Sequence, residues 1–224
     1  MKVLVVAAWE PELARFRGRL AATPVDGVEV VLETVGVGVV EASVGMTRRV
    51  ARHEPDVALL LGTAGALPRA DALGIGQVVV ASSVRLVDAG ILDGRAELPP
   101  PMPATARLDA AIHDVLVAQG AKSVQIANTV GITVDDALAA RLGAGNDHVE
   151  HLEAFAFARA CAASSVRCGV VLGIANGVGA RGRAEWLANH TRASELAADQ
   201  AFAAITAIAA AVRTSTTAPS PARA

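Results

Sequence analysis

Glu153 is the acidic side chain whose position points most directly to chemistry. We expect residues 149–163 to form one helix, because their apolar residues recur at the helical spacing of about 100° per residue. The apolar stripe of that helix comprises Val149, Leu152, Ala156 and Ala160. Glu153 falls inside the stripe, whereas Glu150 and His151 fall outside it. A buried carboxylate is costly unless it is paired or hydrogen-bonded. Glu153 therefore either pairs with an arginine or a loop amide, or meets a polar ligand such as the two neighbouring hydroxyls of a ribose.

Glu12 is a second candidate, at the start of the helix expected after the first strand. Pro11 suits the first turn of a helix, because its amide proton is not needed there. An acidic residue in that turn stabilises a helix by about 0.3–1 kcal/mol through the helix dipole. The same position follows the carboxyl end of a strand, where a base that activates water could also stand. The residue alone leaves both interpretations open.

Asn176 lies in a glycine-rich turn after the last predicted strand. Gly177, Gly179 and Gly182 give the spacing GxGxxG between a strand and a helix. A dinucleotide site also needs an acidic residue about 20 positions further on, at the end of a second strand. Here the residue near that position, Asp199, falls inside a predicted helix. The turn is therefore a weak dinucleotide signal, and a dinucleotide-dependent oxidoreductase is a distant alternative. We expect no cofactor.

The histidines and cysteines predict no metal centre. The five histidines show neither a His-Glu-x-x-His pattern nor ligand spacing with cysteine. Cys161 and Cys168 are too few for a disulfide framework in a chain of this length. They are typical of reduced, buried residues in a cytoplasmic protein.

Buried strands alternate with helices along the chain, and these elements must position the candidate side chains. Short runs rich in β-branched residues predict strands at 3–8, 28–35, 57–61, 77–82, 124–130 and 166–175. Helical spacing predicts helices at 11–20, 40–53, 108–116, 136–142, 149–163 and 183–212. This alternation is typical of a three-layer α/β/α fold with a central mixed, mostly parallel sheet. Ligands of such sheets gather at the carboxyl ends of the strands.

Length and composition limit the classes of function. The chain has 224 residues, 53% hydrophobic and 19% charged, which suits a single domain at 1–212 followed by a disordered tail at 213–224. The net charge of −2 and the 3% aromatic content argue against binding nucleic acid. No run approaches the ~20 consecutive apolar residues of a membrane span, and the N-terminus does not read as a signal peptide. We therefore expect a soluble, cytoplasmic protein that does not insert into a membrane.

Several short motifs, each weak alone, resemble one family through their order and spacing. They are residues 3–12, Val35-Gly36-Val37-Gly38, Leu61-Gly62-Thr63-Ala64-Gly65, residues 74–79, Gly131-Ile132-Thr133-Val134, residues 149–155 and residues 173–179. The set resembles the nucleoside phosphorylase/nucleosidase superfamily, which contains purine nucleoside phosphorylase, methylthioadenosine/S-adenosylhomocysteine nucleosidase and futalosine hydrolase. The resemblance runs from Met1 to about Leu196. Asn176 and the segment 179–186, which ends in Trp186, look most like the futalosine hydrolase branch.

The resemblance implies hydrolysis of the N-glycosidic bond of a purine nucleoside. Futalosine, an intermediate of menaquinone biosynthesis, is the leading substrate, and hypoxanthine is the released base. By resemblance, Glu12 would orient and deprotonate water, Glu153 would grip the ribose hydroxyls, and Asn176 would hydrogen-bond the departing purine. The implied substrate pocket is lined by Gly65, Ile132, Thr133, Leu152 and Phe155. No arginine lies in the glycine turns at 35–39 and 62–67, which favours water over phosphate as the nucleophile.

Three departures from the family pattern keep alternatives open. Leu152 stands where the family has methionine, Ala175 where it has serine, and Leu172 where it usually has arginine. The alternatives are a nucleosidase for methylthioadenosine, S-adenosylhomocysteine or aminofutalosine, a nucleoside phosphorylase, and a diverged nucleoside-binding protein without catalysis. Members of the family usually assemble so that a neighbour closes each substrate pocket. The resemblance therefore implies a homodimer or a higher homo-oligomer.

Overall fold

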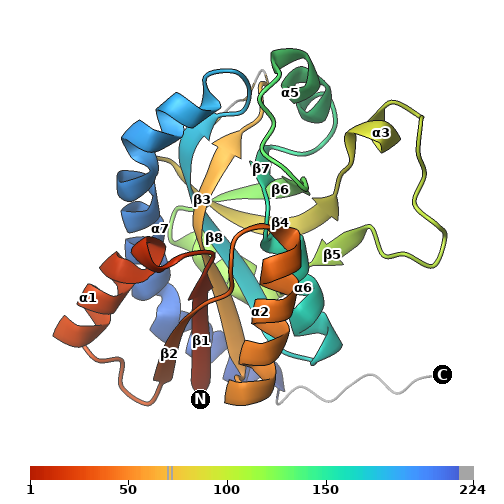
Figure 1. The fold of residues 1–224 in the computed structure, drawn as a ribbon. Helices are drawn as coiled ribbons and strands as arrows, with labels where there is room; N and C mark the ends of the chain where they lie inside the picture. The colour runs from red at the N-terminus through yellow and green to blue at the C-terminus, as the bar shows by residue number, and fades with distance from the viewer. Residues whose placement is uncertain (70, 72, 217–224) are drawn as a thin grey trace.

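The computed structural model describes residues 1–69, 71 and 73–216, which form an eight-stranded mixed sheet with helices on both faces (Figure 1). The strands are β1 (Lys2–Ala7), β2 (Glu29–Thr34), β3 (Val57–Ala66), β4 (Val78–Leu86), β5 (Thr105–Arg107), β6 (Lys122–Asn128), β7 (Val149–His151) and β8 (Arg167–Gly177). The helices are the 3-10 helix η1 (Glu10–Leu13), α1 (Ala14–Ala22), α2 (Gly38–His53), α3 (Ala89–Leu92), α4 (Ala110–Ala118), α5 (Asp136–Gly143), α6 (Ala154–Ala163) and α7 (Gly182–Thr216). The predicted three-layer α/β/α fold is confirmed.

The sheet order is β2-β1-β3-β7-β6-β4-β5, and β8 pairs with both β3 and β4. β1 is parallel to β2 and β3, β3 is parallel to β8, and β6 is parallel to β4 and β7. β7 is antiparallel to β3, and β8 is antiparallel to β4. The pairings β3–β8–β4–β6–β7 return to β3, so these five strands close into a small barrel. The carboxyl ends of β1, β3 and β8 lie together at one end of the sheet.

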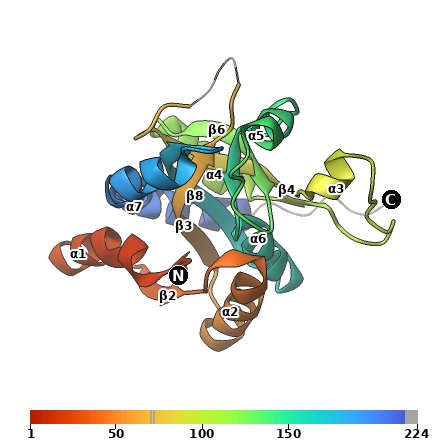
Figure 2. The same cartoon turned by 45° about the horizontal axis from the view of Figure 1, so that its top comes forward.

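Alternate residues of the central strands face two separate cores. Leu4 and Val6 of β1 pack with residues of α2 and α6, whereas Val3 and Val5 pack with residues of α1, α4 and α7. This period of two is what a strand buried on both faces requires. Figure 2 shows α2 and α6 on one side of the sheet and α1 and α7 on the other.

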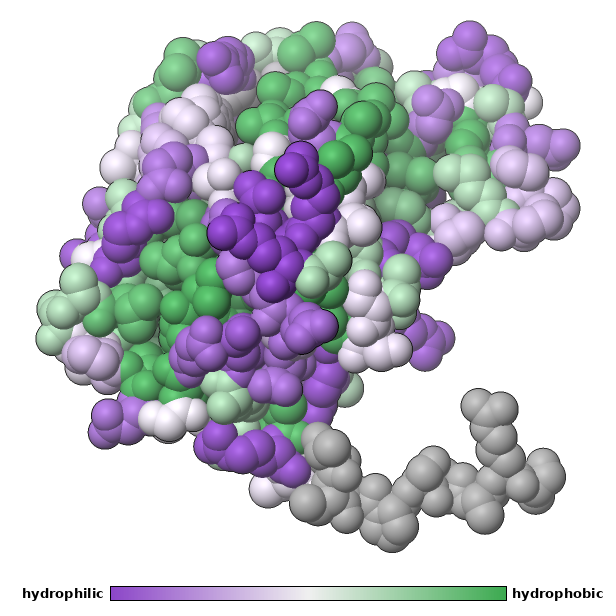
Figure 3. All heavy atoms as spheres, turned by 60° about the horizontal axis from the view of Figure 1, so that its bottom comes forward, coloured by the Kyte–Doolittle hydropathy of each residue, from purple (hydrophilic) through white to green (hydrophobic). Residues whose placement is uncertain are grey.

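α7 is the longest helix and packs closely against β8. Gly173 permits this approach, because a Cβ at that position would lie 2.0 Å from the carbonyl oxygen of Ala193. By length and composition alone, Gly182–Thr214 could cross a membrane, but half of its most apolar window is buried inside the protein. α7 therefore contributes one of its faces to the core of the protein. Elsewhere on the surface, Figure 3 shows polar side chains forming a band between apolar patches.

The structure differs from the sequence-based prediction at several elements. Residues 149–151 form β7, not the first turn of a helix, because they pair with β3 and β6. β3 continues past residue 61 to Ala66, and β5 and α3 were not predicted. α7 continues to Thr216, so residues 213–216 are helical although they were assigned to the tail. The rest of the expected tail, 217–224, lies outside the described residues.

Candidate active site

A cavity of about 530 Å³ opens at the carboxyl ends of β1, β3 and β8. Its size lies in the range of roughly 300–1,000 Å³ that is usual for small-molecule sites. Segments far apart in the sequence line it: Ala8, Trp9, Glu12, Val37, residues 63–65, Ile132, residues 150–153, Asn176, and from the start of α7 Gly182, Arg183, Trp186, Leu187 and His190. The position agrees with the expectation that ligands of α/β sheets gather at the carboxyl ends of strands.

Glu153 lies at the junction between β7 and α6, and only 5% of its surface is exposed. Its Oε1 accepts a hydrogen bond from the backbone N–H of Gly38, at 2.6 Å. Gly38 has a φ of +85°, a conformation that favours glycine, and this conformation accompanies the amide aimed at Glu153. The predicted burial of Glu153 is confirmed, but the predicted reason for that burial is wrong. The carboxylate is buried because it occupies a strand–helix junction inside the cavity, and not because it lies on the stripe of a helix.

His151 is the second feature of this junction, and its predicted place outside the buried stripe is wrong. Its Nδ1 accepts hydrogen bonds from the backbone N–H groups of Glu153 and Ala154, both at 3.1 Å. These amides begin α6, so His151 satisfies donors that the first turn of a helix leaves free. Burial lowers the pKa of His151, which favours the neutral ring with its proton on Nε2. Glu153 Oε2 lies 3.3 Å from the same Nδ1, so two acceptor atoms face each other.

Glu150 was also placed outside the buried stripe, and that prediction is wrong as well. It is 7% exposed and lines the cavity. Its carboxylate accepts hydrogen bonds from the hydroxyls of Thr129 and Thr133 and from the backbone N–H of Thr133. These bonds attach the loop between β6 and α5 to β7. Ile132, which lines the cavity, lies on that loop.

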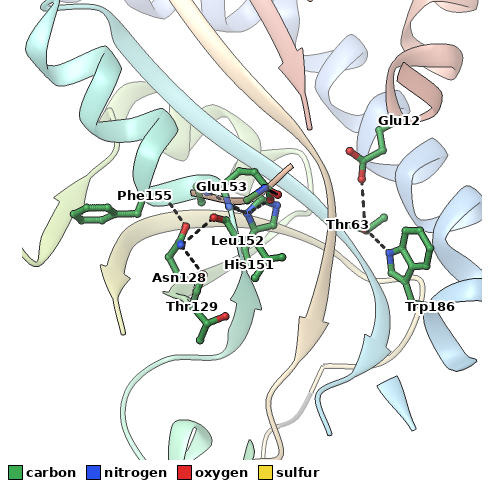
Figure 4. Close-up of polar contacts among 11 residues, drawn as sticks. Glu12, Thr63, Asn128, Thr129, His151, Leu152, Glu153, Phe155 and Trp186 are labelled. Carbon is green, nitrogen blue, oxygen red and sulfur yellow. Dashed lines mark hydrogen bonds and ion pairs between the residues drawn. The ribbon is translucent and has the colours of Figure 1, made fainter. Parts of the chain in front are cut away.

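Glu12 faces the cavity from η1 and is 7% exposed. Its Oε1 accepts a hydrogen bond of 3.4 Å from the hydroxyl of Thr63, which in turn accepts a 3.1 Å hydrogen bond from the ring N–H of Trp186 (Figure 4). Among the described residues, the buried Oε2 of Glu12 has no hydrogen-bond partner. Burial raises the pKa of Glu12 to about 8, and the negative charge of Glu153 acts in the same direction. Glu12 is thus a carboxyl group that can exchange a proton near neutral pH.

Asn176 lies near the end of β8, where it lines the same cavity. Its side-chain Nδ2 donates to the carbonyl of Gly177 at 2.8 Å, and the N–H of Gly177 donates to Glu185 Oε2. Gly65 leaves room for this arrangement, because a Cβ on Gly65 would lie 3.0 Å from Asn176 Nδ2. The side-chain oxygen and one N–H of Asn176 remain for a ligand.

The structure brings most of the predicted site residues together, but not all. Glu12, Glu153, Asn176, Gly65, Ile132 and Leu152 line the cavity. Thr133 lies behind this surface, where its hydroxyl binds Glu150. The expectation that Phe155 lines the pocket is wrong. Because α6 begins at Ala154, the Phe155 side chain packs into the core, and Figure 4 shows it pointing away from Glu153.

Aromatic side chains form one wall of the cavity, and no role was predicted for them. Trp186 stacks on His190 with ring centres 4.2 Å apart, and the ring of Trp9 lies 6.3 Å from Trp186. The guanidinium of Arg183 lies 5.1 Å from the centre of the Trp186 ring. The chain has only two tryptophans, and both line this cavity. The scarcity of tryptophan was the one signal in the sequence for this wall. It could not show that the two residues meet, because they are far apart in the chain.

The charge of the cavity is strongly asymmetric. Glu12, Glu150 and Glu153 all line it, and Arg183 is the one arginine in its wall among the residues that the structure describes. Carboxylates grouped in a site of low dielectric stabilise positive charge on a bound molecule. Within the described part of the chain, no group of three or more His, Cys, Asp or Glu side chains is placed to hold a metal ion.

The raised pKa of Glu12 predicts a stability profile. The native state holds this proton up to about pH 8, whereas the unfolded chain releases it near the ordinary value of 4.5. The free energy of unfolding therefore falls as pH rises from about 4.5 to about 8. Glu12→Gln removes this titration, so we expect its melting temperature to lie near that of the wild type at pH 5 and to exceed it by roughly 10–20 °C at pH 9.

Melting curves of both proteins between pH 5 and pH 9 test this expectation. Glu10→Gln is the matched control, because Glu10 lies in the same 3-10 helix with an exposed side chain paired to Arg17. It should not gain stability at high pH. Parallel curves for wild type and Glu12→Gln across the whole range would contradict the raised pKa.

Comparison with known proteins agrees with this geometry. A futalosine hydrolase from Thermus thermophilus is 33% identical over 174 residues, which cover 70% of this chain and 73% of that protein. The crystal structure of a 5'-methylthioadenosine/S-adenosylhomocysteine nucleosidase from Colwellia psychrerythraea, in complex with adenine, aligns with a TM-score of 0.82 at 20% identity. That alignment covers 93% of this chain and 96% of the other. The native futalosine hydrolase of Helicobacter pylori aligns with the same TM-score at 15% identity, covering 92% of this chain and 98% of the other.

The protein has a nucleoside phosphorylase-like α/β fold. This class is defined here by the closed barrel within a mixed sheet and by the cavity at the carboxyl ends of the strands. The family model described as the Phosphorylase superfamily matches residues 6–210. The chain belongs to this superfamily, as its motifs predicted.

Proposed function

We propose that the protein hydrolyses the N-glycosidic bond of a purine nucleoside, with futalosine as the leading substrate and hypoxanthine as the released base. The observation that carries the proposal is the placement of two buried carboxyl groups in one cavity, Glu153 bound to a backbone amide and Glu12 with an unpartnered oxygen. The names of the relatives from Thermus thermophilus and Helicobacter pylori support this choice of substrate. We place the activity in one domain at residues 1–212, with no cofactor.

Glu153 is suited to bind a ribose diol. The N–H of Gly38 occupies Oε1, while Oε2 faces the acceptor atom Nδ1 of His151 at 3.3 Å. Two facing acceptors are unfavourable until a donor reaches them. A ribose offers two adjacent hydroxyl donors, and a carboxylate can accept both. Binding of the sugar would therefore supply the donors that this junction lacks.

Glu12 is suited to activate water. As the bond between the ribose C1' and the purine N9 breaks, its electron pair leaves with the base, and positive charge develops on the sugar. The carboxylates around the cavity stabilise that charge. The water oxygen bonds to C1', and its proton moves to Oε2 of ionised Glu12, which has no other partner among the described residues.

Asn176 is suited to a 6-oxopurine base. A neutral amide both donates and accepts hydrogen bonds, so it matches the edge formed by N7 and the 6-oxo group of hypoxanthine. It cannot deliver a proton as an aspartic acid can. A nucleosidase for methylthioadenosine, S-adenosylhomocysteine or aminofutalosine is the alternative, and the adenine complex of the Colwellia relative favours it.

Water is favoured over phosphate because the cavity has little positive charge. Arg183 is the one arginine in its wall within the described residues, and it packs on Trp186. A phosphorylase must bind a multiply charged anion next to the sugar, and grouped carboxyl groups oppose a second anion there.

Product analysis tests the proposal. Purified protein is incubated with futalosine, aminofutalosine, methylthioadenosine and inosine, with and without inorganic phosphate, and free bases are measured by liquid chromatography. We expect hypoxanthine from futalosine without any need for phosphate. Phosphate-dependent release would select the phosphorylase, and adenine from the adenosine analogues would select the alternative nucleosidase. A ligand-induced rise in melting temperature without product from any nucleoside would contradict catalysis.

We also propose that the protein acts as a homodimer or a higher homo-oligomer in the cytoplasm, where its two free cysteines stay reduced. Val37, Val40 and Val44 are more than half exposed at the start of α2, as are Val130, Ile132 and Val134 on the loop after β6. Val37 and Ile132 both line the cavity, so the two apolar groups border the same opening. Exposed apolar patches of this kind mark interfaces.

Val44→Glu is expected to reduce the mass in solution to that of the monomer, because it places a charge in the proposed interface. Light scattering coupled to size-exclusion chromatography measures this change. Val117→Glu is the control, since Val117 is an exposed valine on α4, at the other face of the sheet. A wild-type protein that is monomeric throughout the micromolar range would contradict the assembly.

A further inference from the structure

The ring N–H of Trp186 controls a hydroxyl group that contacts Glu12. Trp186 Nε1 donates to Thr63 Oγ1 at 3.1 Å, and Thr63 Oγ1 donates to Glu12 Oε1 at 3.4 Å (Figure 4). An indole N–H can only donate, and a hydroxyl carries a single hydrogen. Because Trp186 occupies a lone pair of the Thr63 oxygen, the Thr63 hydrogen is directed to Glu12. The indole, which can only donate, makes the Thr63 oxygen an acceptor on one side, and the ionised carboxylate, which can only accept, makes the hydroxyl a donor on the other.

The two oxygens of the Glu12 carboxyl group differ as a result. Oε1 is held by Thr63, whereas Oε2 is buried and has no partner among the described residues. An unsatisfied buried acceptor is costly, so Oε2 is the atom prepared to receive a hydrogen from a bound molecule. The glycine before Thr63 maintains this closeness, since a Cβ on Gly62 would lie 3.1 Å from Glu12 Oε1.

The Trp186 ring is itself held in place. His190, one helical turn further along α7, stacks on it with an interplanar angle of 15° and 4.2 Å between ring centres. Arg183, three residues earlier, places its guanidinium 5.1 Å from the centre of the same ring. Contacts at these spacings lie along one face of a helix. α7 therefore fixes the direction of the indole N–H.

We propose that Trp186 is a positioning residue for Glu12, acting through the Thr63 hydroxyl, which occupies Oε1 and leaves Oε2 as the oxygen that takes the proton of the attacking water. The proposal rests on the proposed function, in which Glu12 accepts the proton of that water. It extends that function by assigning to α7 a role in the catalytic step.

Trp186→Phe is the sharpest test, because it keeps an aromatic ring beside His190 while it removes the indole N–H together with the rest of the pyrrole ring. We expect kcat to fall about tenfold with little change in KM. Thr63→Val should give a similar loss, and the double variant should lose no more than either single variant, because both break the same chain of hydrogen bonds. Thr63→Ser keeps the hydroxyl and should restore most of the activity.

The pH profile separates positioning from substrate contact. The Thr63 hydrogen bond lowers the pKa of Glu12, so its loss should move the ascending limb of the kcat profile to higher pH. The other charged or titratable groups of the cavity are Glu150, His151, Glu153, Arg183 and His190, and Trp186→Phe changes none of them. Trp9→Phe, the matched change in the neighbouring ring of the cavity wall, leaves the hydrogen bond from Trp186 to Thr63 intact, so it should not shift the ascending limb whatever its effect on KM. An altered KM with an unmoved limb in Trp186→Phe, or additive losses in the double variant, would overturn the proposal.

Stability measurements decide the proposal without any turnover. The pH at which the melting temperature falls reports the titration of Glu12, and Glu12→Gln shows which part of the curve belongs to it. In Trp186→Phe the pH at which the melting temperature falls should rise. An unchanged value would overturn the proposed link from Trp186 through Thr63 to Glu12. If the wild type releases no base from any nucleoside, the proposed function fails, whereas this curve still tests the link between Trp186 and Glu12.

Discussion

Glu153→Gln is expected to lower kcat by at least about 10³-fold while the protein stays folded. Glutamine has the shape of glutamate, and its side-chain oxygen can still accept the N–H of Gly38. It loses the negative charge that stabilises a cationic sugar and one of the acceptors for the ribose hydroxyls. The measurement is steady-state release of base, with circular dichroism to confirm the fold.

Glu29→Gln serves as the control for this change, because Glu29 is an exposed acid at the start of β2, remote from the cavity. It should retain wild-type kcat. A Glu153→Gln enzyme with more than a tenth of wild-type turnover would show that the carboxylate is not required. That result would contradict the proposed nucleosidase mechanism.

Gly45→Ala is expected to destabilise the protein by about 3 kcal/mol, which lowers the melting temperature by roughly 6–12 °C. A Cβ on Gly45 would lie 2.0 Å from the carbonyl oxygen of Val35 and 2.7 Å from its carbonyl carbon. Both are backbone atoms, so α2 must move away from the strand end. Because Val35 leads into the turn that presents the N–H of Gly38 to Glu153, we also expect a higher KM.

Gly18→Ala is the matched control, a glycine-to-alanine change inside helix α1, which precedes α2 in the chain and lies on the other face of the sheet. A Cβ on Gly18 meets nothing within 4 Å, so the change should stabilise the protein by about 0.5–1 kcal/mol through the lower entropy of the unfolded chain. Thermal denaturation of the two variants should therefore give shifts of opposite sign. Equal shifts would mean that α2 tolerates the added methyl group and that its contact with Val35 is not tight.

The predictable part of the fold is the part in which local pattern and burial agree. Runs of β-branched residues such as those of β1 and β8 are too short for helices and too apolar for loops, so they identify buried strands. β7 has only three residues and no period of its own. It is a strand because β3 and β6 offer it hydrogen-bonding edges, and no local signal records that. The same error placed Glu150 and His151 on the wrong surface.

The candidate site was predictable where a residue follows the end of a strand. Glu12 and Asn176 meet this condition, and both line the cavity. Phe155 was placed in the pocket by the family resemblance alone, and it misses the cavity because α6 begins at Ala154 and its side chain packs into the core. The hydrogen bond from Trp186 to Thr63 joins residues 123 positions apart. Such a contact depends on how α7 crosses β3, so no local sequence pattern can predict it.

α7 divides its tasks along its length. Arg183, Trp186 and His190, in its first turns, face the cavity, whereas Ala197, Ala201 and Ile205 further along belong to the core beneath the sheet. The cavity wall and the core are thus built from different stretches of one helix. Mutational libraries confined to the first turns of α7 would change the wall of the cavity without changing the core residues further along the helix.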